Sequence, residues 1–139
     1  PDSFDPVTRQ NVKWVVDLGT QTHSTPVVAG GRIFLGTNNG NPRDPRHTGD
    51  RGVFLCLDEK DGHLLWQLVV PKLEDDPFLD WPDTGMASEG TVEGDRVYTV
   101  TNRGEVVCLD VHGMANGNDG PYQDEGKHLA LREEAALTP

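Results

Sequence analysis

The residues whose chemistry is most obvious lie near the end of the chain. The stretch from Asp110 to Glu125 is rich in Gly, Asn and Asp and offers carboxylate and amide oxygens. Oxygen donors of this kind suit Ca²⁺, although the spacing is not that of an EF-hand, which places a Glu at the twelfth position. A solvated turn cluster is the commoner meaning of this composition. Calcium stays as the alternative, with four candidate ligands: Asp110, Asn116, Asn118 and Asp119.

The two cysteines, Cys56 and Cys108, allow at most one disulfide and lack the spacing of a metal site. Each precedes Leu-Asp, and they occupy equivalent positions of the repeat described below. Equivalent positions of successive repeats should lie beyond the roughly 7 Å that a disulfide can bridge. We therefore expect two small buried apolar side chains.

The remaining reactive residues do not form a recognisable catalytic group. The five histidines are scattered, and no Ser–His pair comes with an identifiable acid and oxyanion hole. Trp81 and Met86 lie on a long acidic loop over residues 71–87. They either form a recognition surface or cap the face of the blade. We assign no catalytic residue.

Short strands separated by turns must position these residues. Apolar runs of strand length occur at 12–17, 24–29, 32–37, 53–58 and 63–70. Gly30-Gly31 and Asp61-Gly62 mark tight turns between them. Residues 1–11 are expected to be an extended lead-in, and residues 38–52 a long loop like 71–87.

The chain then repeats itself. Ser88–Gly104 aligns without gaps on Ser24–Gly40 at an offset of 64, with seven of 17 positions identical, including the closing Thr, Asn and Gly. Residues 106–110 match residues 54–58 at an offset of 52. A period near 50, with four short strands per unit and glycine-marked turns, is typical of β-propeller blades.

The strand pattern predicts an all-β fold with about two blades' worth of four-stranded antiparallel sheet, as an open arc or partial propeller. The repeat region is 12–110 and comprises an orphan strand at 12–17, a blade at 24–70 and a partial blade at 88–110. Residues 111–139 are expected to be a Gly/Asn/Asp-rich loop and a short C-terminal helix over Asp124–Leu137, capped by Asp124.

The blade ending resembles the pyrroloquinoline-quinone-type (PQQ-type) propeller repeat. The family pattern Ala-x-Asp-x-x-Thr-Gly-Lys-x-x-Trp falls on Cys56, Asp58, Asp61, Gly62, His63 and Trp66, and its Asp, Gly and Trp match in place. The opening of the blade matches at Ser24, Pro26, Val27, Val28, Gly30 and Gly31. This repeat occurs in quinoprotein dehydrogenases and in the outer-membrane assembly lipoprotein that lacks the cofactor. The structural docking motif is then Asp58, Gly62 and Trp66, with Trp14 as the equivalent of Trp66 in the orphan strand. Asp58 would accept turn amides, and the tryptophan ring would lie against the neighbouring blade.

Two blades cannot close a ring, since propellers typically need about 4–8. The chain is therefore expected either to be a piece of a longer propeller or to be completed by other copies, with 12–17 of one copy finishing the second blade of another.

For function, we expect a non-enzymatic scaffold that binds a protein or small ligand at its loop rim, with no cofactor. The alternative is part of a PQQ- and calcium-dependent dehydrogenase; those enzymes carry adjacent cysteines, which this chain lacks. A net charge of −11 argues against nucleic acid, and no apolar run is long enough to span a membrane. We expect a periplasmic or secreted location.

Overall fold

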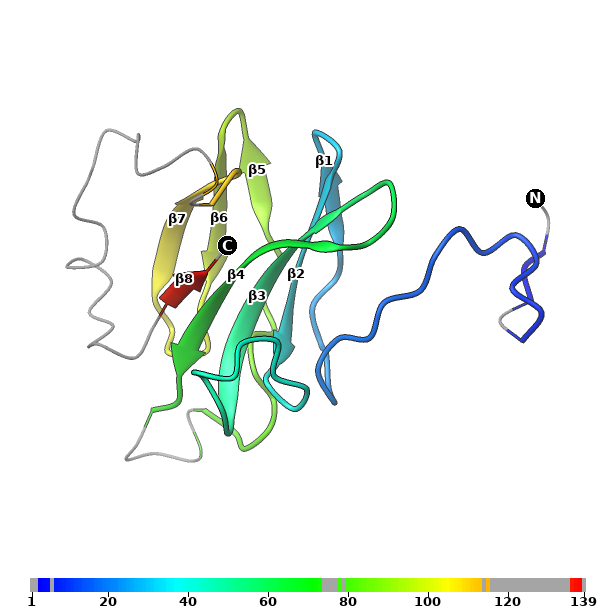
Figure 1. The fold of residues 1–139 in the computed structure, drawn as a ribbon. Helices are drawn as coiled ribbons and strands as arrows, with labels where there is room; N and C mark the ends of the chain where they lie inside the picture. The colour runs from blue at the N-terminus through cyan, green and yellow to red at the C-terminus, as the bar shows by residue number, and fades with distance from the viewer. Residues whose placement is uncertain are drawn as a thin grey trace.

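The computed structural model describes residues 3–5, 7–73, 78, 80–113, 115 and 136–138. These residues form two antiparallel sheets (Figure 1) with strand orders β1-β2-β3-β4-β8 and β5-β6-β7. The strands are β1 (Val27–Ala29), β2 (Arg32–Asn38), β3 (Arg51–Asp58), β4 (Leu64–Pro71), β5 (Thr91–Glu93), β6 (Arg96–Val100), β7 (Val106–Asp110) and β8 (Ala136–Thr138). Every assigned element in the described part is a strand, which confirms the all-β prediction. The described part of the chain contains no helix long and apolar enough to cross a membrane.

The repeat in the sequence is a repeat in strand pairing. In the first sheet Val28 lies opposite Ile33, and Phe34 lies opposite Cys56. In the second sheet the residues at the expected offsets make the same pairs, with Val92 opposite Val97 and Tyr98 opposite Cys108. The two aligned stretches therefore fold into the same hairpin and third strand.

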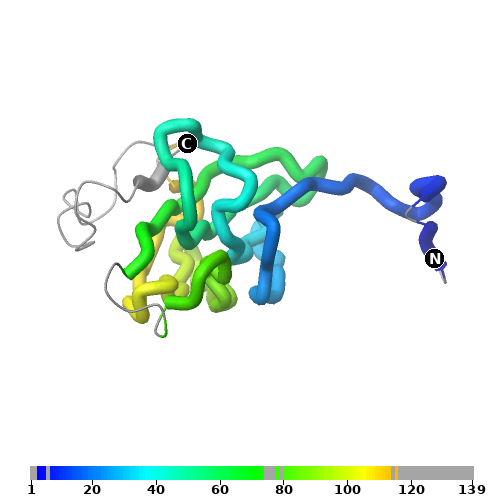
Figure 2. Tube along the Cα trace, turned by 90° about the horizontal axis from the view of Figure 1, so that it is seen from below, coloured from blue at the N-terminus to red at the C-terminus, as the bar shows by residue number. Residues whose placement is uncertain are grey.

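The main core lies between the two sheets, which stand face to face in both views (Figures 1 and 2). One face of the first sheet contributes aromatic rings, with Phe34, Phe54 and Trp66 in mutual contact at centroid distances of 6.0–6.4 Å. The second sheet packs Val97, Val107 and Leu109 against them. The alternation of side chains along each strand makes this possible, because every second residue faces the neighbouring sheet.

A smaller core covers the opposite face of the first sheet. Its buried members are Leu35, Val53, Leu55 and Leu57. Val16 and Leu18, from the extended chain that precedes β1, pack on it. The first sheet is thus covered on both faces, and β3 is buried along nearly its whole length.

Two expected elements differ in the structure. Residues 12–17 are extended but belong to no strand, because the described part of the chain gives them no neighbouring strand to pair with. The helix expected over Asp124–Leu137 lies mostly outside the described residues, and at its end Ala136–Thr138 form β8 instead. There, hydrogen bonding to the edge of β4 overrides the local helical preference of the sequence.

Candidate functional site

The clearest constellation built by the repeat is a docking contact around Trp66. The ring belongs to β4 and is only 1 % exposed. Its Nε1 donates a hydrogen bond at 2.9 Å to the carbonyl of Val111, in the turn that follows β7 of the second sheet. The ring also lies so close to Gly113 that a Cβ there would come within 2.6 Å of the tryptophan Cγ. A large apolar ring with one satisfied N–H thus joins the two sheets.

Trp14 makes the same contact one repeat earlier. Its Nε1 donates to the Glu59 carbonyl at 3.1 Å, and a Cβ on Gly62 would come within 2.7 Å of its ring. Donor and acceptor are both displaced by 52 positions from Trp66 and Val111, the offset of the third strands. Residues 12–18 therefore contact the first sheet as β4 contacts the second.

The aspartates that begin the turns after β3 and β7 accept the same kind of hydrogen bond. Oδ1 of Asp58 accepts the Lys60 amide at 2.6 Å, and Oδ1 of Asp110 accepts the His112 amide at 2.6 Å. Asp110, one of the calcium candidates, thus closes its own turn. The other three candidates, Asn116, Asn118 and Asp119, lie outside the described residues.

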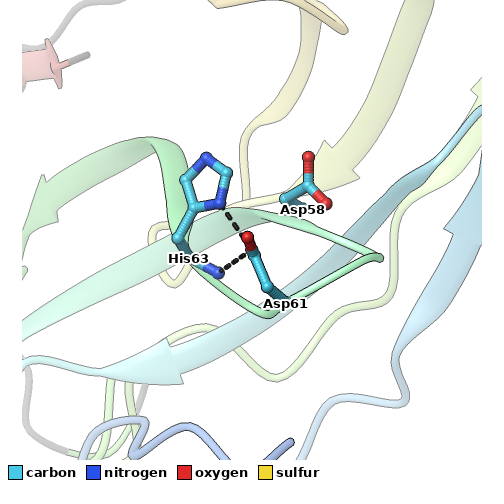
Figure 3. Close-up of side chains that lie close together, drawn as sticks. All are labelled: Asp58, Asp61 and His63. Carbon is cyan, nitrogen blue, oxygen red and sulfur yellow. Dashed lines mark hydrogen bonds and ion pairs between the residues drawn. The ribbon is translucent and has the colours of Figure 1, made fainter. Parts of the chain in front are cut away.

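A cluster with metal-ligand chemistry is present in the first of these turns. Oxygen or nitrogen atoms of Asp58, Asp61 and His63 lie within 4.8 Å of one another. Figure 3 shows His63 Nδ1 against Asp61 Oδ1 at 2.6 Å, with the same oxygen accepting the His63 amide. The hydrogen bonds from the His63 side chain and backbone lower the pKa of Asp61. These internal contacts brace the turn, and we assign no metal to it.

A depression of about 660 Å³ lies beside the loop that follows β4. Trp81 and Phe78 are its large apolar residues and are 66 % and 84 % exposed. The full lining is Gln21, His23, Phe78, Trp81, Pro82 and Thr84. Two chain segments that are far apart in sequence, one before β1 and one after β4, therefore form one surface.

Asn38 holds these two segments together. It ends β2 and is 2 % exposed. Its Oδ1 accepts the amides of Thr20 and Gln21 at 2.8 and 3.2 Å. Its Nδ2 donates to the Asp83 carbonyl at 2.5 Å. A single buried amide thus fixes both walls of the depression.

A second polar network fixes the position of Trp81. Lys72 Nζ donates to the Trp81 carbonyl at 2.7 Å and forms an ion pair with the buried Asp80. Asp80 also accepts the Nδ2 of Asn102 at 2.8 Å. Asn102 stands 64 positions after Asn38, so the same residue of each repeat holds the neighbouring loop.

Met86 is not part of this surface. It is 0 % exposed and belongs to the core between the sheets, with its amide donating to the Thr37 carbonyl at 3.1 Å. Of the two loop residues proposed for recognition, only Trp81 is accessible. A single methionine in a polar loop carries no sequence signal of burial, because the residues that it packs against, on β2 and β3, are distant in sequence.

The cysteines divide between two environments. Cys56 is buried, and this burial raises the pKa of its thiol to about 12. Cys108, expected to be buried as well, is exposed, because the described chain places no further sheet over β7. Each cysteine lies on the third strand of a different sheet. This placement does not fit the adjacent cysteine pair that the quinoprotein resemblance implies for a bound quinone.

Sequence reasoning missed Asn38 and Asn102 as positioning residues. Both belong to the Thr-Asn pair that is identical in the two copies. A polar residue repeated at the end of a strand was the available signal, because a buried amide must find several partners. The partners themselves, in loops of different length, follow no repeat.

Comparison with known proteins agrees with this geometry. A family model described as outer membrane protein assembly factor BamB, built on the PQQ-type repeat, matches residues 8–112. No curated protein matches the chain. The matched region contains both docking tryptophans and seven of the eight strands. The chain therefore belongs to the PQQ-type β-propeller repeat family described as outer membrane protein assembly factor BamB.

Proposed function

We propose that this propeller segment is a non-enzymatic scaffold that binds an extended, partly apolar protein segment in the depression beside Trp81. The observation that carries the proposal is the exposure of two aromatic side chains, Trp81 and Phe78, along one depression. Exposed aromatic residues grouped on one surface mark interaction sites more often than single exposed apolar residues do. Tryptophan is also enriched among the residues that dominate binding energy.

The polar residues of the depression support a binding role. Gln21, His23 and Thr84 offer an amide, an imidazole and a hydroxyl around the apolar centre. A pocket with an apolar base and a few polar groups that fix orientation is the usual form of a recognition site. The hydrogen bonds of Asn38 and the Lys72–Asp80 pair hold the walls in place before a ligand arrives, which lowers the ordering cost of binding.

The protein's charge restricts the partner. With a net charge of −11, the surface favours neutral or basic segments over acidic ones. Membership of the PQQ-type repeat family supports a location outside the cytoplasm, in the periplasm or secreted, where such a scaffold would meet its partners.

A displayed library of random peptides, selected on the immobilised protein, tests the proposal. Peptides that are enriched on the wild type should carry aromatic or aliphatic residues and lose at least tenfold in affinity for Trp81→Ala. Val7→Ala serves as the control, because Val7 is an exposed apolar residue (89 %) that does not line the depression. Enriched peptides that bind Trp81→Ala as tightly as wild type would refute the site.

Trp81 fluorescence provides a second readout. The chain has three tryptophans that fluoresce. Trp66 is buried and Trp14 is held on Gly62, so Trp81 is the most exposed to solvent and the one whose emission a ligand in the depression should change. A bound peptide should shift the emission to shorter wavelength in the wild type and leave Trp81→Phe unchanged.

A further inference from the structure

The three tryptophans differ in what their indole N–H groups bind. Trp14 and Trp66 donate to backbone carbonyls at 3.1 and 2.9 Å. The indole N–H of Trp81 donates to none of the residues that the structure describes, and this tryptophan is 66 % exposed. A tryptophan that becomes buried usually finds an acceptor for this group. A ligand that covers Trp81 therefore has to supply that acceptor.

Most of the backbone around the depression is already hydrogen-bonded. Both backbone groups of Gln21 bind Asn38, each at 3.2 Å. The Asp83 amide donates to Asp50 Oδ2 at 2.7 Å, and the Asp83 carbonyl accepts Asn38 Nδ2 at 2.5 Å. Pro82 has no N–H to offer. Addition of a ligand strand needs a row of unpaired amides and carbonyls, and these walls do not provide one. Recognition therefore depends on side chains.

A ligand in the polyproline II (PPII) conformation fits such walls. PPII has no internal hydrogen bonds, so its carbonyls are free to accept from side-chain donors. Its prolines carry no N–H, so few ligand amides would be left unpaired in the depression. Grooves that bind PPII segments are lined by aromatic side chains, which here are Trp81 and Phe78. The side chains of Gln21 and His23 add further groups that can donate.

Asp83 adds a negative charge at the same place. It lies between two lining residues, Pro82 and Thr84, and is exposed. Its carboxylate forms no ion pair or hydrogen bond with another residue in the described ranges. The neighbouring Asp80, by contrast, is buried and paired with Lys72. An uncompensated carboxylate at the rim, in a protein with a net charge of −11, is complementary to a ligand that carries a cation.

We propose that the occupant of the depression is a proline-rich segment in the PPII conformation that carries an arginine or lysine. This inference rests on the proposed function, because it names the class of partner for the same site. The proline rings pack on Trp81 and Phe78, and a ligand carbonyl accepts a hydrogen bond from Trp81 Nε1. The cationic side chain of the ligand pairs with Asp83.

Two peptides titrated calorimetrically into the full chain test the ligand conformation. One contains leucine, proline and a single arginine, and the other has alanine in place of every proline. Alanine loosens the free peptide and restores N–H groups that find no partner in the depression. The proline peptide should therefore bind about tenfold more tightly than the alanine peptide. Equal or tighter binding of the alanine peptide would overturn the inference.

The same titrations separate this inference from the proposed function. If the two peptides bind equally and both lose affinity for Trp81→Ala, the site stands and only the PPII ligand class is wrong. If no peptide, from the library or from this pair, depends on Trp81, the proposed function and the inference fail together.

Trp81→Phe tests the hydrogen bond from the indole. The variant keeps an aromatic ring and removes only the N–H donor and part of the ring area. Loss of one hydrogen bond should weaken binding of the proline peptide about 2- to 12-fold. A Trp81→Phe variant that binds as tightly as the wild type would show that the ligand supplies no acceptor to the indole, contrary to the proposal.

Asp83→Asn tests the charge. Asp83 has a φ of 58°, which asparagine also tolerates, so the variant should keep the fold. At low salt it should weaken the arginine-containing peptide about 2- to 5-fold and leave a copy with alanine for arginine unaffected. Glu93→Gln removes an exposed charge at the end of β5, outside the depression, and should bind like the wild type. Equal losses for the two variants would overturn the contact between Asp83 and the ligand.

Discussion

Trp66 and Trp14 make equivalent contacts in two different surroundings. Each indole N–H donates to a carbonyl displaced by the same number of positions, and each ring covers a glycine of the next turn. Trp66 stands in a hydrogen-bonded strand between two sheets and is 1 % exposed. Trp14 lies on a segment that pairs with no strand among the described residues, and its ring is only partly buried. The contact of each tryptophan with the following turn therefore follows from the repeat itself. The burial of the ring depends in addition on the neighbouring sheet.

Replacing the two tryptophans should separate these contributions. Trp66→Ala removes a fully buried ring and leaves a cavity between the sheets, so it should lower the free energy of unfolding by about 3–5 kcal/mol. Trp14→Ala removes a partly exposed ring whose surroundings can relax, and should lower it by about 1–2 kcal/mol. Urea unfolding followed by circular dichroism measures both. Equal losses would contradict the difference in setting.

The glycines beneath the rings allow a finer test. Gly113 and Gly62 have φ of 60° and 78°, where an alanine is strained by about 1–2 kcal/mol. Their Cβ atoms would also overlap the tryptophan rings. Trp66 cannot move away, so Gly113→Ala should add an overpacking cost of about 1–3 kcal/mol, whereas Trp14 can shift outward from Gly62→Ala.

Gly30→Ala is the control for these two variants. Gly30 has φ of 57° and open space around it, so only the backbone strain should remain. The order of destabilisation in urea should be Gly113→Ala, then Gly62→Ala, then Gly30→Ala. If Gly30→Ala were as costly as Gly113→Ala, the ring contacts would contribute nothing.

The cysteines extend the comparison to the two sheets. Cys108 should react with a thiol reagent within minutes, and Cys56 only at the rate of unfolding. The raised pKa of Cys56, about 12, means that the folded state favours the protonated thiol. This contribution to stability is complete below the unfolded pKa of about 8.5 and is lost as pH rises toward 12, with a slope approaching about 1.4 kcal/mol per pH unit.

Cys56→Ala should abolish that slope, and Cys108→Ala should leave it unchanged. Unfolding in urea at a series of pH values between 8 and 11 measures it. A wild type whose stability is flat across this range would show that Cys56 is accessible to solvent.

The repeat accounts for what could be predicted from sequence. Two offsets, 64 and 52, matched β1, β2 and β3 with β5, β6 and β7 and paired Trp14 with Trp66, because both repeats pack in the same way. Where the structure departs from prediction, the cause lies outside the repeat. Cys108 is exposed because no described sheet covers β7, and Met86 is buried because it packs into the core between the sheets, beside Gly36 and Gly52.

The depression beside Trp81 was predicted only in part. The tryptophan was recognisable as a large apolar residue in an acidic loop. Its partners Gln21 and His23 lie some 60 positions earlier, and no local pattern connects them. They meet because Asn38 binds both segments, a long-range contact that a single sequence does not reveal.

The short final strand changes how the molecule meets other β-structure. By pairing with residues 67–69 of β4, β8 occupies the edge of the larger sheet. This edge would otherwise offer unpaired amides and carbonyls to another protein chain. β8 therefore blocks strand pairing between molecules, the first step of amyloid-type aggregation, along this edge of the sheet. Removing Ala136–Thr138 would therefore expose the edge of β4 and allow another chain to pair with it.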